Sequence, residues 1–416
     1  MKTMKIPSGW KLCKQSDVSA FYNGRAYKLS EWETEGTPVI RLQNLTGTGN
    51  EYYYSNLKLP VHQYADNGDL LYMWSATFGP KIWQGEKAIY HYHIWKVVCK
   101  DDLLDQSFMY YNLDFITESM KSKTNGSTML HFTKKGMEEH EILLPPLVEQ
   151  EKIAEYLSTV DKKIDLIDQK IAETEKLKTG LMQKLFSEGV GVQDENGNWQ
   201  PHTEFQASPF GNVPKCWLKV SLENIASVER GKFSARPRND PKYFGGNIPF
   251  VQTGDVVNAQ LYVESYSQTL NELGLTVSKT FPTETILITI AANIGDVAIT
   301  QFPLACPDSL VGIQAKKDIC DSLWLFFFMQ TQKSELDSKA TKSAQKNINL
   351  QVLKPLTVFL PPLEEQEFIA EILLASEKKI ALLKQQKTET QQLKKGLMQK
   401  LLTGEWRVPV EETEAA

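Results

Sequence analysis

The strongest constraint on the fold is an internal repeat, because residues 144–185 and 360–401 align without a gap and are identical at 26 of 42 positions. Both copies begin with Leu-Pro-Pro-Leu, and both end with Gly-Leu-Met-Gln-Lys-Leu. The segments in front of the copies are related only loosely, with Trp10 matching Trp217 at a different offset. The sequence therefore predicts a duplicated frame that holds two diverged inserts.

Each repeated stretch has the pattern of a long helix with a heptad seam. The prolines at its start end the preceding strand, and apolar residues then recur at alternating steps of four and three. In the first copy, polar Thr174 and Lys178 interrupt the seam. Neither helix would be stable alone in water, so we expect an antiparallel coiled coil of the two rather than two helices on separate domains. The residues expected in the coiled coil or at a partner are Glu149, Gln150, Ile153, Leu157, Ile164, Ile167, Leu181, Leu185, Glu365, Gln366, Ile369, Leu373, Ile380, Leu383, Leu397 and Leu401.

Composition and charge leave several function classes open. The 416 residues are 41% hydrophobic and 23% charged, and no apolar run approaches the ~18 residues of a membrane helix. The five cysteines form no C-x-x-C pair, which favours a reducing cytoplasm and argues against a zinc site. The net charge of −5 comes from the repeats and the linker between them. This distribution permits DNA binding without indicating it.

The variable halves show mainly strand patterns, at residues 38–45 and 68–74 in the first half and at 248–256 and 283–290 in the second. We expect each half to be an α/β or mainly β domain with a twisted sheet and irregular loops. Base sequence is read by donors and acceptors at the groove edges, where arginine pairs with guanine and asparagine or glutamine with adenine. Loops with such side chains are therefore candidates for DNA contacts, although a solvated loop is the alternative for each of them.

Three sets of loop residues are candidates. The first is a basic loop of the second half with Arg230, Lys232, Ser234, Arg236 and Arg238, whose counterpart in the first half has only Arg25 and Lys28 among several acids. The second set follows the first strand of each half and comprises Arg41, Gln43, Asn44, Gln252 and Thr253. The third set precedes each repeat and comprises Lys121, Lys123, Thr124, Asn125, His131, Lys342, Ser343, Gln345 and Lys346.

Two weaker patterns favour no site. Pro307-Asp308 with Lys316 faintly resembles a metal-dependent nuclease core, but the second carboxylate is missing. His91 and His93 lie on one face of a strand pattern without a nearby third ligand, so we interpret them as a strand surface and not as a metal site.

The twice-repeated L-P-P-L-x-E-Q helix, each copy after a variable half that opens with I/V-P-x-x-W, closely resembles the specificity subunits of type I restriction–modification systems. The resemblance covers nearly the whole chain. It implies an α+β protein with two α/β target-recognition domains, which read the two halves of a bipartite DNA site. It also implies a spacer of paired antiparallel helices that separates the domains and docks two methyltransferase subunits, which methylate adenine N6. Restriction–translocase subunits would join the full complex.

The resemblance implies no chemistry in this chain, and the sequence agrees. The Pro-Pro pairs lie between leucines and lack the amide and the aromatic of an adenine methyltransferase motif, and no G-x-x-x-x-G-K-[ST] loop occurs. We therefore expect no catalytic residue, metal or cofactor here, with S-adenosylmethionine, ATP and Mg²⁺ on the partner subunits. A protein-binding scaffold of the same architecture is the alternative. The expected division is 1–143 and 213–359 for the recognition domains, 144–188 and 360–404 for the helices, 189–212 for a linker and 405–416 for a tail.

Overall fold

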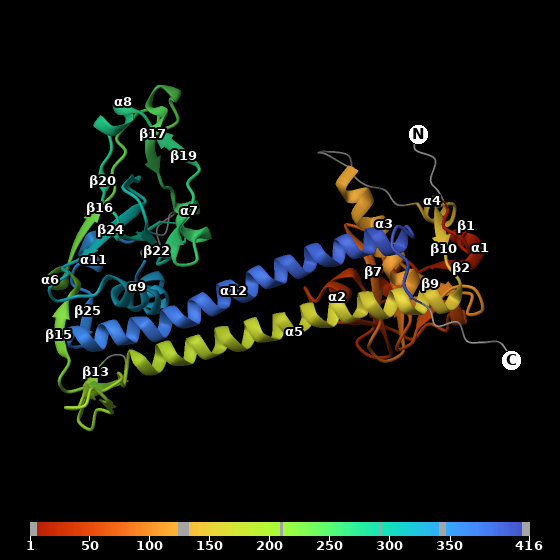
Figure 1. The fold of residues 1–416 in the computed structure, drawn as a ribbon, viewed down its shortest axis with the longest axis horizontal. Coiled ribbons are helices and arrows are strands. Elements are labelled where there is room, and N and C mark those ends of the chain that lie inside the picture. Colours follow the sequence, from red (N-terminus) through yellow and green to blue (C-terminus); the bar gives the residue numbers. More distant parts are fainter. Residues whose placement is uncertain (1–5, 124–132, 209–210, 292, 341–346, 410–416) are drawn as a thin grey trace. The chain divides into compact units, whose positions relative to one another are not determined.

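The structure, a computed structural model, describes residues 6–123, 133–208, 211–291, 293–340 and 347–409, and its chain forms two compact units. Unit 1 comprises residues 1–168 and 385–416, and unit 2 comprises residues 169–384. The two longest helices, α5 (Leu147–Leu185) and α12 (Leu363–Leu402), each pass from one unit into the other (Figure 1). Each unit therefore contains one diverged half and a part of both helices, and the predicted linear division into domains stays a prediction.

Unit 1 contains two four-stranded sheets. One is antiparallel throughout and has the order β2 (Ser19–Asn23), β9 (Ile94–Cys99), β6 (Leu70–Ser75), β7 (Thr77–Ile82). The other has the order β4 (Tyr53–Ser55), β3 (Thr37–Ile40), β8 (Ala88–Tyr90), β5 (Tyr64–Ala65), and β3 and β8 are parallel. A separate pair, β1 (Lys11–Lys14) and β10 (Glu141–Leu144), leads into α5. The remaining helices are α1 (Gln15–Val18), α2 (Leu42–Thr46), α3 (Gln106–Lys123), α4 (Lys134–Glu138) and the short 3-10 turns η1 (Leu29–Glu31) and η2 (Val61–Gln63).

Unit 2 repeats this plan, with one more strand in its first sheet. Its first sheet has the order β16 (Ala226–Arg230), β24 (Leu310–Ala315), β21 (Ile286–Thr289), β22 (Val297–Thr300), β18 (Tyr262–Val263). Its second has the order β19 (Gln268–Leu270), β17 (Phe244–Phe250), β23 (Leu304–Ala305), β20 (Thr280–Phe281), with β17 and β23 parallel. The pair β15 (Leu218–Ser221) and β25 (Thr357–Leu360) leads into α12. The other elements are α6 (Leu222–Ile225), η3 (Pro241–Tyr243), α7 (Thr253–Asn258), α8 (Glu272–Thr276), α9 (Ser322–Thr331), α10 (Lys333–Lys339), α11 (Leu350–Leu353), β11 (Val192–Gln193), β12 (Trp199–Gln200), β13 (Phe205–Ser208) and β14 (Gly211–Pro214).

The predicted strands are partly confirmed. Residues 68–74 and 283–290 contain β6 and β21, and all four residues of β21 are buried. The predictions at 38–45 and 248–256 were too long, because β3 and β17 end at Ile40 and Phe250 and are followed by the short helices α2 and α7. Asn44 and Asp255, in the first turns of these helices, stabilise the helix starts, since their side chains accept hydrogen bonds from the backbone N–H groups of Arg41 and Gln252.

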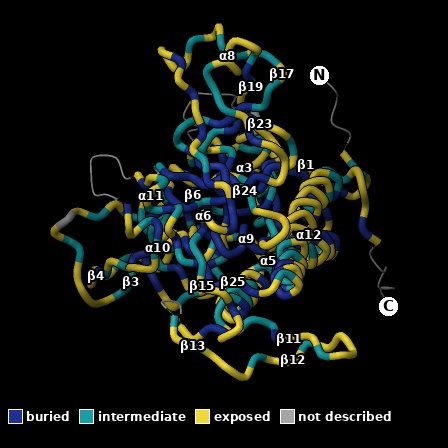
Figure 2. Tube along the Cα trace, turned by 90° about the vertical axis from the view of Figure 1, so that its left-hand side faces the viewer, coloured by how far each residue is buried: buried dark blue, intermediate teal, exposed yellow. Residues whose placement is uncertain are grey.

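Each unit has a core in which its sheet, its short helix and the end of a long helix meet. The apolar run Trp324–Met329 lies in α9 and is buried throughout. Its neighbours in the core include strand residues such as Ile288 and the α12 residue Ile369. The buried strands β6 and β24 contrast in Figure 2 with the exposed turn between β11 and β12. Burial of one sheet face and of one helix side supplies most of the favourable free energy of such a unit.

In unit 1 the two long helices run antiparallel. Lys387 Nζ lies 2.7 Å from Asp168 Oδ1, and Lys394 Nζ lies 2.8 Å from Asp161 Oδ1. A higher residue number on one helix thus pairs with a lower number on the other. Lys394 is largely buried and also pairs with Asp114 of α3 at 3.3 Å, so the ion pairs connect α3 to both long helices.

Unit 2 shows the same antiparallel pairing. Lys384 Nζ lies 3.1 Å from Glu175 Oε1, and Lys178 forms an ion pair with Glu377. The Lys178–Glu377 pair is largely buried. A buried pair that loses one partner costs more than a surface pair, because an uncompensated charge remains. These contacts therefore define which residues of the two helices lie opposite each other.

The heptad seam is more continuous than the sequence suggests. Thr174 is not an interruption of the packing, because its side chain is only 7% exposed and its hydroxyl donates to Lys170 O at 2.6 Å. Thr390 of α12 repeats this arrangement with Gln386 O at 2.7 Å. The predicted seam residues that are buried are Ile153, Leu157, Ile167, Leu185, Ile369, Leu373, Ile380, Leu383 and Leu401, and those that are half-buried are Ile164, Leu181 and Leu397.

Candidate nucleic-acid interface

The Glu-Gln pair of each repeat attaches the helix to its unit. Gln150 is fully buried, accepts from the N–H of Asp105 at 2.9 Å and donates to the carbonyls of Leu103 and Pro145, both at 2.9 Å. Gln366 makes the equivalent bonds to Asp321, Ile319 and Pro361 at 2.9, 3.1 and 2.8 Å. Every partner atom belongs to the backbone. The glutamine therefore fixes the orientation of the helix start whatever side chains surround it.

The glutamate before each glutamine is a buried acceptor. Glu365 is 1% exposed and accepts from Trp217 Nε1 at 2.9 Å and from the N–H groups of Val190 and Gly191 at 2.8 and 3.1 Å. Its Oε1 also lies 2.9 Å from His202 Nε2. The segment predicted as a linker is thus packed on the start of α12 within unit 2.

Glu149 repeats this arrangement in unit 1 with a different donor. It accepts from Trp10 Nε1 at 3.0 Å, and Arg407 donates to its two oxygens at 2.6 and 2.8 Å. Glu149, Gln150, Glu365 and Gln366 are therefore buried attachments and do not lie in the seam between the helices. A direct contact of these four side chains with a partner protein stays a prediction, against which their burial argues.

The first candidate loop of unit 2 lies against a turn between β23 and β24. Arg230 Nε donates to Asp308 O at 2.6 Å, and Arg238 Nη2 forms an ion pair with Asp308 Oδ2 at 2.9 Å. A side chain at Gly231 would place its Cβ 2.2 Å from Pro307 O, so only glycine permits this close approach. The turn at residues 307–309 thus positions the basic loop.

The second candidate set meets the same turn of unit 2. Thr253 Oγ1 lies 3.1 Å from Ser309 Oγ, and Gln252 Nε2 donates to Gln268 Oε1 at 2.5 Å. Of the first set, Lys232 and Ser234 donate their backbone N–H groups to Cys306 O and Val277 O, and Arg236 donates to Ala235 O. The loop at residues 230–238 and the loop at residues 252–253 therefore both contact the turn between β23 and β24 of unit 2.

The turn between β8 and β9 has the equivalent position in unit 1. His91 donates its backbone N–H to Ile40 O at 2.9 Å and forms a β-bridge with Arg25. A Cβ at Gly24 would lie 2.3 Å from His91 O, which repeats the close approach at Gly231. The interpretation of His91 and His93 as a strand surface is confirmed only in part, because His91 forms a β-bridge with Arg25 whereas Tyr92 and His93 form the turn.

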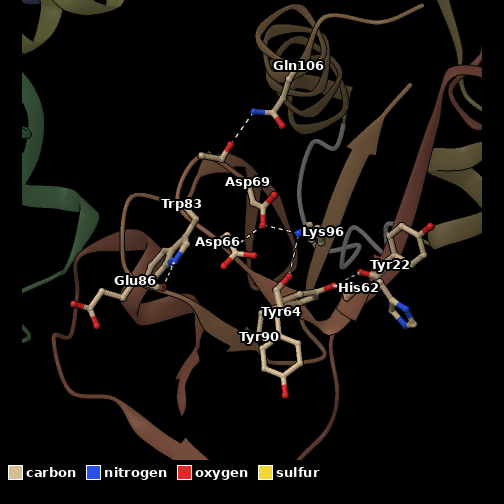
Figure 3. Close-up of polar contacts among 11 residues, drawn as sticks. Tyr22, His62, Tyr64, Asp66, Asp69, Trp83, Glu86, Tyr90, Lys96 and Gln106 are labelled. Atoms are coloured by element: carbon tan, nitrogen blue, oxygen red, sulfur yellow. Dashed lines mark hydrogen bonds and ion pairs between the residues drawn. The ribbon is translucent and has the colours of Figure 1, made fainter. Parts of the chain in front are cut away.

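A polar network holds this turn in place from the interior of unit 1. Tyr90 is 1% exposed, and its hydroxyl donates to His62 O at 2.6 Å (Figure 3). In the same network, Lys96 Nζ contacts Asp69 Oδ2 at 2.5 Å and Tyr64 O at 3.1 Å. The network anchors β8, which ends at Tyr90 directly before the turn, so the turn is supported by rigid elements, as a recognition site requires.

Aromatic rings surround the turn of unit 1 where unit 2 has basic side chains. The ring of Trp32 lies 4.6 Å from Tyr53, and the Arg41 guanidinium lies 4.9 Å from the same tyrosine ring. Tyr92 and His93 have ring centroids 3.8 Å apart. Rings of this kind can stack on bases or contact thymine methyl groups. The few basic residues that the sequence shows in this half are thus combined with an aromatic surface.

Burial keeps the two histidines neutral. It lowers the pKa of His91 from 6.5 to about 4, with smaller contributions from the charges of His93 and Arg41. The pKa of His93 is also lowered, by burial and then by Arg41. A neutral imidazole both donates and accepts hydrogen bonds, so at neutral pH these side chains offer polar contacts instead of positive charge.

The low pKa of His91 predicts an acid-dependent loss of stability. The unfolded chain binds a proton at His91 near pH 6.5 and the folded chain only near pH 4, so stability falls as the pH drops between these values. Because the ring is partly exposed, we expect a loss of only ~1 kcal/mol from pH 7 to pH 5. Urea unfolding at both pH values should show that His91→Gln removes this part of the pH dependence. An unchanged difference between the two pH values would contradict the assignment.

Several predicted residues are placed with other roles or lie outside the described part of the chain. Asn44 caps α2, and its amide also donates to Gly49 O and Glu51 O. Gln43 lies within α2 and Lys123 at the end of α3, and Lys121 of α3 pairs with Glu118 at 3.0 Å. Residues outside the described ranges are Thr124, Asn125, His131, Lys342, Ser343, Gln345 and Lys346.

The two turns are the feature that sequence reasoning missed. Asp308 entered only as a weak nuclease pattern with Lys316, and the structure separates these residues by the length of β24. A signal was present, since Gly24 and Gly231 both lie 14 residues after the matching Trp10 and Trp217. Among the described residues, no group of three or more His, Cys, Asp or Glu side chains could hold a metal ion. The described helices include none that is long and apolar enough to span a membrane.

Two related units, each with one loop-bearing turn and each attached to a long helix in the same way, define a duplicated recognition protein. The family model of the type I restriction modification DNA specificity domain matches residues 7–176 and 214–392. The chain therefore belongs to the family of DNA specificity subunits of type I restriction–modification systems.

Individual relatives agree with this family. The type I restriction enzyme MjaVIII specificity subunit of Methanocaldococcus jannaschii is 28% identical over 98% of this chain and 95% of its own length. The EcoBI specificity subunit of Escherichia coli is 23% identical over 88% and 79%. The fold matches a chain from a solved type I restriction–modification assembly, with a TM-score of 0.62, 18% identity and coverage of 97% and 100%. It also matches the specificity subunit from M. genitalium, with a TM-score of 0.55, 14% identity and coverage of 97% and 98%.

Proposed function

We propose that this chain is the non-catalytic subunit that selects the DNA site of a type I restriction–modification complex. Unit 1 reads one half of a bipartite site through the turn at residues 91–93, and unit 2 reads the other half through the turn at 307–309. The paired helices set the unread gap and dock two methyltransferase subunits for adenine N6 methylation. S-adenosylmethionine, ATP and Mg²⁺ act on the methyltransferase and on the restriction–translocase subunits.

The convergence of two candidate loops on one turn in each unit carries this proposal. In unit 2 the contacts of Arg238 and Thr253 with residues 308 and 309 bring basic and polar side chains together. In unit 1, His91 lies against Gly24, directly after β2, and bonds to Ile40 at the end of β3. These contacts bring Arg25 and Arg41 to the same turn. Phosphate contacts supply affinity and orientation, whereas contacts to base edges supply the sequence. Two such surfaces of different chemistry suit two different half-sites.

The proposal is tested by expressing the chain with the methyltransferase subunit of its own system and mapping N6-methyladenine in the host DNA. We expect one split motif, with two short half-sites around a fixed gap. A stable complex with the methyltransferase but without any methylated motif would refute DNA reading and favour the protein-binding scaffold instead.

The basic loop of unit 2 gives a prediction for one half-site. Alanine at both Arg230 and Arg238 should weaken binding of DNA with the complete site by roughly 10–100-fold, since each contact to a base or phosphate contributes about 1–3 kcal/mol. The matched control is Lys215→Ala, because Lys215 is also exposed and pairs with Glu204 at 3.1 Å. Fluorescence anisotropy with DNA altered in one half-site at a time would locate the loss. A loss at the half-site read by unit 1 would contradict the assignment.

A further inference from the structure

Asp308 holds the guanidinium group of Arg238 at the turn between β23 and β24. Arg238 Nη2 donates to Asp308 Oδ2 at 2.9 Å, and the two side chains are 51% and 39% exposed. A long side chain without a partner would sample many rotamers at the surface. The ion pair therefore gives one arginine of the basic loop a fixed orientation while the side chain stays accessible to a ligand.

The turn that carries Asp308 is fixed by bonds to the first sheet of unit 2. The N–H of Leu310 donates to Pro307 O at 3.1 Å and closes the turn, and the N–H of Gly231 donates to Leu310 O at 2.9 Å. Arg230 Nε, at the end of β16, donates to Asp308 O at 2.6 Å. The position of the carboxylate is thus set by β16 and β24, and it does not depend on the basic loop alone.

The ion pair leaves most donors of Arg238 available. Arginine has five N–H donors in one plane, and the bond to Asp308 uses Nη2. Within the described ranges, Nε and Nη1 of Arg238 make no hydrogen bond. A guanidinium held in this way still presents two parallel N–H groups, which is the geometry that matches O6 and N7 of guanine in the major groove.

The carboxylate beside Arg238 favours a base edge over a phosphate as the ligand. The Arg238–Asp308 pair carries no net charge, and a phosphate in contact with Arg238 would lie close to the negative charge of Asp308, which repels it. The edge of a G·C pair is uncharged and offers two acceptors on guanine. It also offers the N4 amino group of cytosine, from which a carboxylate can accept a hydrogen bond.

The turn of unit 1 has no equivalent of this pair. Residues 91–93 include no carboxylate. Arg25, which follows Gly24 beside that turn, does pair with Glu31 at 2.5 Å, but its Nη1 is buried and cannot reach a base edge. The fixed and exposed arginine is therefore a feature of unit 2 and not of the duplicated frame, as expected of a residue that distinguishes one half-site from the other.

We propose that Arg238 reads a guanine in the half-site of unit 2 by donating to O6 and N7 in the major groove, and that Asp308 is the positioning residue that fixes its guanidinium. This assignment rests on the proposed function and names one base of its target. Lys232 and Arg236 are exposed in the same loop. They contact phosphates and supply affinity that is independent of sequence.

The test uses the full chain in complex with its methyltransferase subunit, and synthetic duplexes that contain the motif methylated by the wild-type complex. Each guanine of the motif is replaced in turn by 7-deazaguanine, which still pairs with cytosine but lacks the N7 acceptor. At one position in one half-site, we expect the replacement to weaken binding by the wild-type complex roughly tenfold. The same replacement should weaken binding by the Arg238→Ala complex no more than about twofold, because the contact is already lost.

Two further variants separate a base contact from a phosphate contact. Arg238→Lys keeps the charge and loses the fork of parallel donors, so it should weaken binding of the intact motif roughly tenfold. Asp308→Asn keeps the arginine and should lower the preference for that G·C pair roughly fivefold. The matched control is Glu204→Gln, which removes the carboxylate of the exposed pair with Lys215 and should leave both quantities unchanged. The thermal midpoint of each variant complex checks that unit 2 is folded.

The outcomes distinguish this inference from the proposed function. An Arg238→Lys complex that binds like the wild type would assign Arg238 to a phosphate and overturn the guanine contact. Equal effects of 7-deazaguanine on the wild-type and Arg238→Ala complexes at every position would overturn it as well, and either result would leave the proposed function standing. A wild-type complex that methylates no motif would instead refute the proposed function itself.

Discussion

Replacement of Glu365 by alanine is expected to destabilise unit 2 by roughly 3–5 kcal/mol. The carboxylate is 1% exposed and accepts from the indole of Trp217 and from two backbone N–H groups at Val190 and Gly191. Alanine would leave these buried donors without an acceptor and would open space at the junction. Urea unfolding followed by tryptophan fluorescence should show a much lower midpoint.

The neighbouring Glu364 provides the control for this prediction. It is exposed, so Glu364→Ala should change the free energy of unfolding by no more than about 0.5 kcal/mol. Glu365→Gln should be less destabilising than Glu365→Ala, because the glutamine carbonyl still accepts a hydrogen bond. It should not restore the full stability, because the glutamine NH₂ group would face N–H donors. Equal midpoints for the alanine variants at 364 and 365 would show that the buried carboxylate does not stabilise the junction.

Lengthening both long helices by one heptad is expected to change the gap in the DNA motif and leave its half-sites unchanged. Duplicating residues 167–173 in α5 and 383–389 in α12 keeps the heptad seam of both helices in frame. Seven residues add about 10 Å, which corresponds to roughly three base pairs of duplex. Methylome sequencing of cells that express the variant complex measures the gap directly.

An insertion elsewhere serves as the control for the spacer. Seven residues added in the exposed turn at 195–197, between β11 and β12, should leave the gap as it is, because this hairpin lies outside the helix pair. A heptad duplication that altered the bases of a half-site would contradict the separation of reading from spacing.

The sequence predicts the frame of this protein well because the frame is repeated and periodic. The heptad steps identified Ile153, Leu157 and Leu373 as buried residues, and the Leu-Pro-Pro motif placed the start of each helix within a few residues. The pattern did not show that Gln150 bonds only to backbone atoms, since such contacts join segments distant in sequence. Thr174 was predicted to interrupt the heptad seam, because a periodic pattern detects the polarity of a residue and not its packing.

The candidate site was only partly predictable for the same reason. The high density of basic residues in one loop identified Arg230 and Arg238. The turn residue Asp308, which positions them, lies 70 residues after Arg238 in the sequence. In unit 1 the surface around His91 is aromatic, and no local pattern distinguishes a surface aromatic from a core one. The histidines were therefore assigned to a strand, although the β8–β9 turn brings them beside Arg41.

The backbone-only attachment at Gln150 and Gln366 has a consequence for how new specificities arise. Each glutamine side chain forms hydrogen bonds to three main-chain groups. Such groups are present whatever residue occupies the position. Mutations or exchanged gene segments can therefore change side chains of a unit without removing these particular hydrogen bonds to the helix. If each unit reads one half-site as proposed, exchange of the diverged half of one unit would change one half of the DNA target and would keep the glutamine attachments of both long helices.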